Sequence, residues 1–590
     1  MAKVSVFLIS VALIAGMVGC GDITPSGNLK IRDWYDLNAV RNNLGGNHIL
    51  MNDLDSTTAG YTELAGPTAD GGAGWQPIGG EFSLFTGTFD GQEHEIRGLF
   101  INRPDESWVG LFSTVDEEGV IENVGVVNAN VIGERGVGGL AGFNGGTVGN
   151  SYLTGGVTGE ERVGGLTGQS RGTVSDCYSI GSVTGYDGVG GLVGWSYDST
   201  VSNSHYNYDE VLINGENIIT VGALFPDDFD EWLANDKFLD VTEKLSQEDG
   251  YYVVNNISDF KELLAFGQND TLKFRLKNDL DLAAEPGLYI PYLAGEFDGN
   301  GHEISNLSFD FDFVSHVGLF GYLAPGGKIT RVGADNVNVT GTSYVGGLAG
   351  YSAGIVSDSH AIGSVTGDVS GTGNEECFGG LVGLNEGTVS NCYAAANVTG
   401  DLWAGGLVGL NDQGTVSDSY STGRVNGNFD VGGLAGENWG TVSNSYSIAD
   451  VIGDYSVGGL AGGNFGTVSN SYSTGNVTGD EEVGGLVGLS EGTVSNSYST
   501  GSVSGNEDVG GLVGVNYGPV STSFWDIETS GQITSDGGTG RTTAQMKSIT
   551  TFSGAMWNIV TVTNPGERNA SFIWNIVDDE TYPFLSWQPA

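Results

Sequence analysis

A short glycine–leucine element recurs along this chain and restricts its fold more than any other feature. The string Val-Gly-Gly-Leu-x-Gly, or a close variant, occurs ten times in 590 residues. Most neighbouring copies are 26 residues apart, and one interval of 33 contains an insertion around residues 368–376. Self-similarity at a fixed short period is the signature of a stacked repeat architecture. The leucines of the ten copies are Leu140, Leu166, Leu192, Leu348, Leu381, Leu407, Leu434, Leu460, Leu486 and Leu512.

Each repeat predicts one coil of a parallel β-solenoid. Its apolar residues lie in three short pieces, separated by Gly, Asn and Ser, which turn the chain tightly. In the repeat that begins at Val483, these pieces are residues 483–487, residues 494–498 and Val503. Three short strands per turn is typical of a solenoid coil. The predicted fold class is therefore all-β, a parallel β-solenoid or β-helix of about 26-residue coils.

The alternation of side chains along a strand predicts which of them point inward. We expect Val494 and Tyr498 to face the core and Asn496 to join a stacked ladder of amides near a corner. The tyrosines that recur in the slot of Tyr498 are interpreted as core packing rather than as a ligand-binding stripe. These residues are Tyr152, Tyr178, Tyr393, Tyr420, Tyr446, Tyr472 and Tyr498, with His205 and His360 in the same slot.

A larger duplication lies over the repeats and predicts two modules. Residues 89–96 match residues 297–304 at an offset of 208, and repeats follow each copy. Each leader predicts a short helix, one with Asp33 as its N-cap and one over residues 259–266, that covers the open end of a solenoid. The predicted segments are a signal peptide (1–19), a linker (20–29), a first leader with three repeats (30–208), a connection (209–248), a second leader with seven repeats (249–520) and a C-terminal cap (521–590).

The N-terminus carries an export signal. Lys3 precedes an apolar run over residues 4–17, which is too short for a comfortable membrane span. The sequence Met-Val-Gly-Cys that ends at Cys20 resembles the lipobox of bacterial lipoprotein signal peptides. That resemblance implies cleavage before Cys20 and acylation of its thiol, which anchors a protein to a membrane. An ordinary secretory signal is the alternative. We therefore expect an exported protein that is lipid-anchored at the cell envelope or surface, or else secreted.

The ten repeats with their Gly-Leu-x-Gly element resemble the GLUG-motif family. The resemblance covers both arrays and their leaders. Repeats of this family occur in large bacterial and archaeal surface proteins, including adhesin-like proteins. The resemblance implies a cell-surface repeat module and implies no particular reaction.

Charge and motifs narrow the function classes further. The chain has 21 Lys and Arg against 72 Asp and Glu, and a net charge of −51. Such a charge argues against nucleic-acid binding, because it repels phosphates. The sequence has no P-loop and no Gly-x-Ser-x-Gly elbow in a strand-to-helix context, and short glycine patterns that match within the repeats do so by chance. His94 and His302, each followed by Glu, lack the second histidine of a helical zinc site, so a shared structural role in equivalent turns is expected.

Carboxylates, among them Asp430, gather in the turn before each Gly-Gly pair and predict an acidic edge on the stacked coils. Three uses of this edge stay open: solvation that blocks edge-to-edge aggregation, calcium binding between neighbouring loops, and catalysis. No cofactor is expected apart from calcium. The calcium candidates are Asp480, Glu481, Glu482, Glu507 and Asp508.

The remaining signals concern the cysteines and the C-terminus. Cys177 and Cys392 precede the recurring tyrosine, where small buried thiols are expected, and a Cys377–Cys392 disulfide stays open. Residues 542–545 form a capping-box pattern. Three tryptophans in the last 40 residues, at positions 557, 574 and 587, favour a packed C-terminal cap.

Taken together, the sequence predicts a non-enzymatic surface protein. It would adhere to, or bind, a glycan or another surface protein through a rigid β-solenoid, and would touch the membrane only through its lipid anchor. Two alternatives stay open. One is a carbohydrate-active β-helix enzyme of the polysaccharide lyase or hydrolase type, and the other is a purely structural spacer of the envelope.

Overall fold

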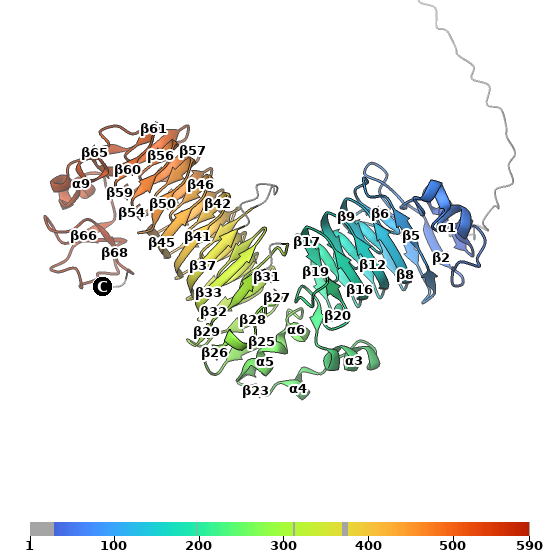
Figure 1. Ribbon diagram of the computed structural model, residues 1–590. Coiled ribbons are helices and arrows are strands. Elements are labelled where there is room, and N and C mark those ends of the chain that lie inside the picture. Colours follow the sequence, from blue (N-terminus) through green and yellow to red (C-terminus); the bar gives the residue numbers. More distant parts are fainter. Residues whose placement is uncertain (1–28, 197–198, 311–312, 368–375, 589–590) are drawn as a thin grey trace, which may run out of the picture.

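The computed structural model describes residues 29–196, 199–310, 313–367 and 376–588, so the predicted signal peptide and Cys20 lie outside the described residues. Two stacks of short parallel strands meet at an angle (Figure 1). The four sheets of the first stack contain 7, 4, 8 and 3 strands, and those of the second contain 12, 15, 9 and 7. Equivalent residues of neighbouring coils, such as Val457 and Val483, pair in register. The predicted fold class, an all-β parallel solenoid of about 26-residue coils, is confirmed.

One coil of the second stack shows how the repeat folds. Its four sides are β56 (Glu481–Gly484), β57 (Val487–Ser490), β58 (Thr493–Ser495) and a last side of β59 (Tyr498–Ser499) with β60 (Val503–Ser504). The prediction of three strands per coil is therefore wrong. The piece over residues 483–487 forms two strands, because the chain turns a corner between Gly484 and Val487.

Close packing explains the glycines of this corner. A Cβ at Gly484 would collide with the carbonyl oxygen of Val487, and a Cβ at Gly485 would collide with the carbonyl oxygen of Gly511 in the next coil. Leu486, which follows them, is fully buried. The repeated Gly-Gly-Leu string thus combines a corner that excludes side chains with an inward apolar anchor.

The core contains apolar columns and one column of amides. Val494 and its equivalents are buried as predicted. A fully buried amide ladder that the sequence did not predict consists of Asn385, Asn411, Asn438 and Asn464. Each Nδ2 donates to the Oδ1 of the next asparagine, at 2.8, 2.7 and 2.9 Å. Asn496 lies half-buried at a corner with a left-handed φ of 48°. As predicted, side chains of its row are linked from coil to coil: Asn496 Oδ1 accepts from Thr522 Oγ1 at 2.6 Å, and in the first stack Asn150 Nδ2 donates to Asn123 Oδ1 at 2.8 Å.

The recurring tyrosines stack as predicted, but they stack outside the solenoid. Their rings lie 4.9 Å apart at Tyr446, Tyr472 and Tyr498, with interplanar angles of 4° and 2°. Tyr498 belongs to a cluster with the C-terminal segment and not to the solenoid core. The prediction of an inward tyrosine ladder is wrong because the left-handed residue Asn496 interrupts the alternation, so that Ser497 points inward and Tyr498 outward.

Helices lie at the ends of the stacks and beside them (Figure 1). The Asp33 carboxylate caps the first helix by accepting from the Asp36 N–H at 2.8 Å, as predicted. The second leader helix starts two residues before the predicted segment and uses Asn256 as its cap. In the described residues the helices are α1 (Trp34–Ala39), α2 (Tyr61–Leu64), α3 (Pro226–Ala234), α4 (Val241–Lys244), α5 (Ile257–Lys261), α6 (Leu263–Phe266), α7 (Ile527–Ser530), α8 (Thr543–Met546) and α9 (Ile549–Gly554).

The C-terminal segment packs against the outer tyrosine column. Thr542 and Gln545 form the predicted capping box of α8. The small sheet of β66 (Ile559–Thr561), β67 (Trp574–Ile576) and β68 (Phe584–Leu585) follows α9. The ring centroids of Trp574 and Tyr498 are 5.8 Å apart, so the predicted packed cap is present. In the first stack, Trp232 of α3 covers the equivalent column at His205, and the two ring centroids are 5.0 Å apart.

Candidate functional site

Two carboxylates and four aromatic side chains share one outer surface of the second stack, which we call the carboxylate face. It is built on β46 (Phe429–Gly432) and β51 (Tyr455–Gly458) of one sheet, and on β47 (Ala435–Asn438) and β52 (Ala461–Asn464) of the next. The two sheets meet at the Gly-Gly-Leu corner. The residues of this face are Phe429, Asp430, Glu437, Trp439, Tyr455 and Phe465.

Two pairs of stacked rings flank this face. Phe429 and Tyr455 have centroids 5.1 Å apart and planes 7° apart, and both are exposed, at 45% and 41%. Trp439 and Phe465 have centroids 4.4 Å apart and planes 10° apart, and Trp439 is 52% exposed. Stacking covers one face of each ring with its partner, and Phe429, Tyr455 and Trp439 stay exposed to solvent. Two apolar ridges therefore run along the stack on either side of the carboxylates.

A missing side chain leaves a hollow between the ridges. In register along this sheet, Leu410, Glu437, Gly463 and Leu489 occupy the same outward position of successive coils. A Cβ at Gly463 would lie 3.0 Å from Oδ1 of Asp430 and 3.3 Å from Cγ of Glu437. Glycine thus opens a space that both carboxylates border, at a place where neighbouring coils carry leucine.

Burial makes these carboxylates unusually basic. Desolvation, with the nearby charge of Glu482, raises the pKa of Asp430 to about 6, although hydrogen bonds from Ser456 and Trp403 oppose the rise. Desolvation, with the charge of Asp430, raises the pKa of Glu437 to about 7. Glu437 is only 7% exposed. At neutral pH the pair carries charge at a cost in folding free energy, as functional sites often do.

The sequence interpretation included Asp430 in the acidic edge but missed Glu437. The available signal was a departure from the repeat. Two coils read Val-Gly-Leu-Asn at residues 382–385 and 408–411, whereas the next two read Ala-Gly-Glu-Asn and Ala-Gly-Gly-Asn at 435–438 and 461–464. A charged residue and then a glycine replace an outward leucine in consecutive coils, which indicates a local use of the surface.

The structure separates the calcium candidates into three rows along the stack. Asp480 lies at a corner, where its Oδ1 accepts from Asn506 Nδ2 at 2.8 Å. Glu481 and Glu507 pair in a second row. Glu482 accepts a hydrogen bond from Ser456 and lies in a third row with Asp508. Within the described parts of the chain, no group of three or more His, Cys, Asp or Glu side chains is placed to hold a metal ion.

The histidines of the two His-Glu pairs lie in turns, and the described cysteines are buried. His94 Nδ1 lies 3.2 Å from Asp53 Oδ1, and His302 Nδ1 lies 2.9 Å from Asp279 Oδ1, so the two turns are equivalent as predicted. The three described cysteines, at positions 177, 377 and 392, are buried free thiols, so Cys377 and Cys392 form no disulfide in this structure.

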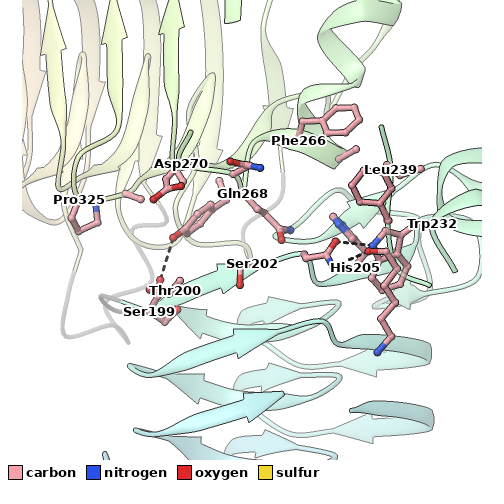
Figure 2. Close-up of a pocket in the computed structure, with 18 residues that line it drawn as sticks. Ser199, Thr200, Ser202, His205, Trp232, Leu239, Phe266, Gln268, Asp270 and Pro325 are labelled. Atoms are coloured by element: carbon pink, nitrogen blue, oxygen red, sulfur yellow. Dashed lines mark hydrogen bonds between the residues drawn. The ribbon is translucent and has the colours of Figure 1, made fainter. Parts of the chain in front are cut away.

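A second hollow lies where the two stacks meet (Figure 2). It has a volume of about 580 Å³. One wall is the last coil of the first stack, and the opposite wall comes from α6, the segment after it and the first coils of the second stack. Burial lowers the pKa of His205, which lines this hollow, to about 3, so its imidazole is neutral at physiological pH.

Fold and surface together define a parallel β-solenoid repeat protein with a carboxylate-bearing outer face. The family model described as the GLUG motif matches residues 374–399, 404–426, 453–478 and 479–504. The chain therefore carries GLUG repeats, as the resemblance implied.

Two curated proteins are similar to part of the chain. A protein of Evansella cellulosilytica described as a Gly-rich membrane protein is 35% identical over 135 residues, which are 22% of this chain and 15% of that protein. Halomucin of Haloquadratum walsbyi is 35% identical over 150 residues, which are 23% of this chain and 2% of that protein. The chain thus matches only a small share of either relative.

One solved structure was also matched. It is a Bacteroides ovatus protein described as an immunoglobulin A1 protease, at 19% identity and a TM-score of 0.33, covering 58% of this chain and 96% of that one. Among the described residues, no helix has both the length and the hydrophobicity needed to cross a bilayer.

Proposed function

We propose that this chain is a non-enzymatic protein of the cell surface that binds a glycan on its carboxylate face. The observation that carries this proposal is the placement of Asp430 and Glu437. Between coils that place Leu410 and Leu489 at this outward position, two costly carboxylates border a hollow without a side chain. Neither carboxylate is needed to form the coil, since neighbouring coils form without them.

The chemistry of the face suits a sugar. Carboxylates accept hydrogen bonds from hydroxyl groups, and aromatic ridges pack against the apolar C–H patches of a pyranose ring. The two ridges, at Phe429–Tyr455 and Trp439–Phe465, lie on either side of the acidic hollow. A rigid sheet fixes all of these groups before binding, which reduces the entropic cost of association.

A glycan array probed with the mature chain tests this proposal, followed by calorimetry on each glycan that binds. We expect Trp439→Ala and Glu437→Gln each to weaken binding at least about tenfold. Tyr517→Ala is the matched control, because Tyr517 is 76% exposed and occupies the position of Trp439 three coils further on. Absence of binding to every glycan, or an equal loss of affinity in Tyr517→Ala, would contradict the proposal.

The surface location is part of the proposal. Its support is the lipobox-like sequence at Cys20 and the similarity to a protein described as a membrane protein and to halomucin. Expression of the full chain in a bacterial host should yield an acylated protein in the membrane fraction. Cys20→Ala should release it into the soluble exported fraction, whereas release of the unchanged chain would favour the secreted alternative.

The raised pKa of Glu437 supports one other candidate, a carbohydrate-active enzyme. A carboxyl group that titrates near neutral pH can act as a general acid on a glycosidic oxygen. Release of new reducing ends from an array-positive glycan, lost in Glu437→Gln, would favour this enzyme. Binding without turnover favours the non-enzymatic function, and absence of any ligand favours the structural spacer.

A further inference from the structure

The hollow between the stacks borders an unpaired sheet edge. The last coil of the first stack contributes β19 (Thr200–Ser202), and among the described strands β19 ends its seven-stranded sheet. Within the second stack, the N–H groups of Val494 and Asn496 donate to Pro519 and Ser521 of the next coil, at 3.0 and 3.3 Å. The equivalent N–H groups of the last coil of the first stack belong to Val201 and Asn203, for which the described residues provide no following strand. In place of a strand carbonyl, the Tyr292 hydroxyl accepts from the Val201 N–H.

Side chains of the second stack already imitate the missing strand on either side of these groups. The Gln268 amide accepts from the Ser204 N–H at 3.0 Å and donates to the Ser204 carbonyl at 2.9 Å. A side-chain amide thus makes the pair of hydrogen bonds that a peptide group would make. At the other end, the Tyr292 hydroxyl donates to the Ser199 carbonyl over a long 3.4 Å. The edge around β19 therefore bonds the Gln268 amide as it would bond a peptide group, and it bonds the Tyr292 hydroxyl only weakly at Ser199.

The shape of the hollow suits an extended chain. Its lining includes β19, which spans about 10 Å at the rise of a β-strand, and continues past the corner at Asn203 to His205. The volume of about 580 Å³ beside this edge forms a slot with room for a short extended segment. Apolar residues of the opposite wall, including Leu239, Phe266 and Ala324, can cover one face of the occupant.

We propose that this slot binds an extended peptide segment of a partner protein, which adds a strand to β19. Strand addition at an open edge takes its affinity from main-chain hydrogen bonds and its specificity from alternate side chains. In this sheet, Thr173, Val174 and Ser175 pair with the identical triplet of β19, so a small polar–Val–small polar sequence fits the next position. The triplets of this chain that the structure describes are already paired in sheets, so the segment comes from another protein.

The test uses the full mature chain and a five-residue peptide with the sequence of residues 492–496. We expect saturable binding, with slowed amide exchange at Val201 and Asn203. The same peptide with methylated backbone nitrogens should bind at least about tenfold more weakly, because it loses the N–H groups that would donate to the carbonyls of the edge. Equal binding of both peptides, or no change at the two amides, would overturn the proposal.

Two pairs of variants test whether the peptide binds in the slot. Tyr292→Phe removes the competing hydroxyl and should tighten binding, whereas Tyr322→Phe, its in-register partner one coil on, should not. Ala324→Phe fills the slot and should weaken binding at least about tenfold. Ala353→Phe repeats that change one coil on, outside the slot, and controls for folding. Dimerisation of the chain alone that the peptide reverses would overturn the assignment to a partner protein.

Discussion

Replacing Glu437 by leucine should stabilise the protein, and should do so increasingly as the pH rises. The neighbouring coil carries Leu410 at this position, so the backbone accepts the change. The pKa of Glu437 rises from an ordinary 4.5 to about 7 on folding, chiefly through desolvation. Because the folded state holds its proton more tightly, ionisation lowers the free energy of unfolding as the pH passes from 4.5 towards 7, and the full cost remains above pH 7.

The magnitude follows from this difference in pKa. Each pH unit between the two values costs about 1.4 kcal/mol, so ionised Glu437 lowers the free energy of unfolding by about 3 kcal/mol at pH 8 and by about 1 kcal/mol at pH 5. Part of the cost comes from repulsion by Asp430, which the substitution also removes. We therefore expect Glu437→Leu to raise the free energy of unfolding by about 2 kcal/mol more at pH 8 than at pH 5.

Urea unfolding at the two pH values, followed by circular dichroism, measures this difference. The lower pH is 5 because the protein approaches its isoelectric point of about 4.1 below that. Glu491→Leu is the matched control: Glu491 is exposed in a nearby coil, and its replacement should change the free energy of unfolding by less than about 0.5 kcal/mol. An equal effect of Glu437→Leu at both pH values would refute the reasoning from desolvation.

Three further results are expected. Tyr472→Ala should lower the free energy of unfolding by about 3 kcal/mol and expose the tryptophans of the cap. Tyr393→Ala should lower it by only about 1 kcal/mol, because the tyrosine column is half-exposed there. Urea unfolding followed by tryptophan fluorescence checks both. Burial raises the pKa of the Cys177 and Cys392 thiols to about 12, so a thiol reagent at pH 8 should modify them only after unfolding. Calcium at about 5 mM should shift the melting temperature by less than about 1 °C relative to chelator, and a larger rise would support calcium binding between the loops.

The sequence predicted the stacking of coils but not every direction of a side chain. Ten copies of one string at a fixed period leave few alternatives to a solenoid, and inward Val494 follows from simple alternation. Tyr498, four residues later, points outward because Asn496 adopts a left-handed conformation that resets the alternation. Asparagine tolerates that conformation, but nothing local requires it. The sequence alone therefore does not predict that Tyr498 points outward.

The same logic explains where function can lie in such a fold. The inward valines, leucines and asparagines and the corner glycines maintain the coil, so they recur in most repeats. Outward positions carry no such requirement, and a change there leaves the backbone of the next coil in place. A binding surface on this scaffold must therefore appear as a departure from the repeat. Glu437 and Gly463 differ from the leucines of the flanking coils, Leu410 and Leu489. An average over the ten repeats reveals the fold but does not show such a local difference.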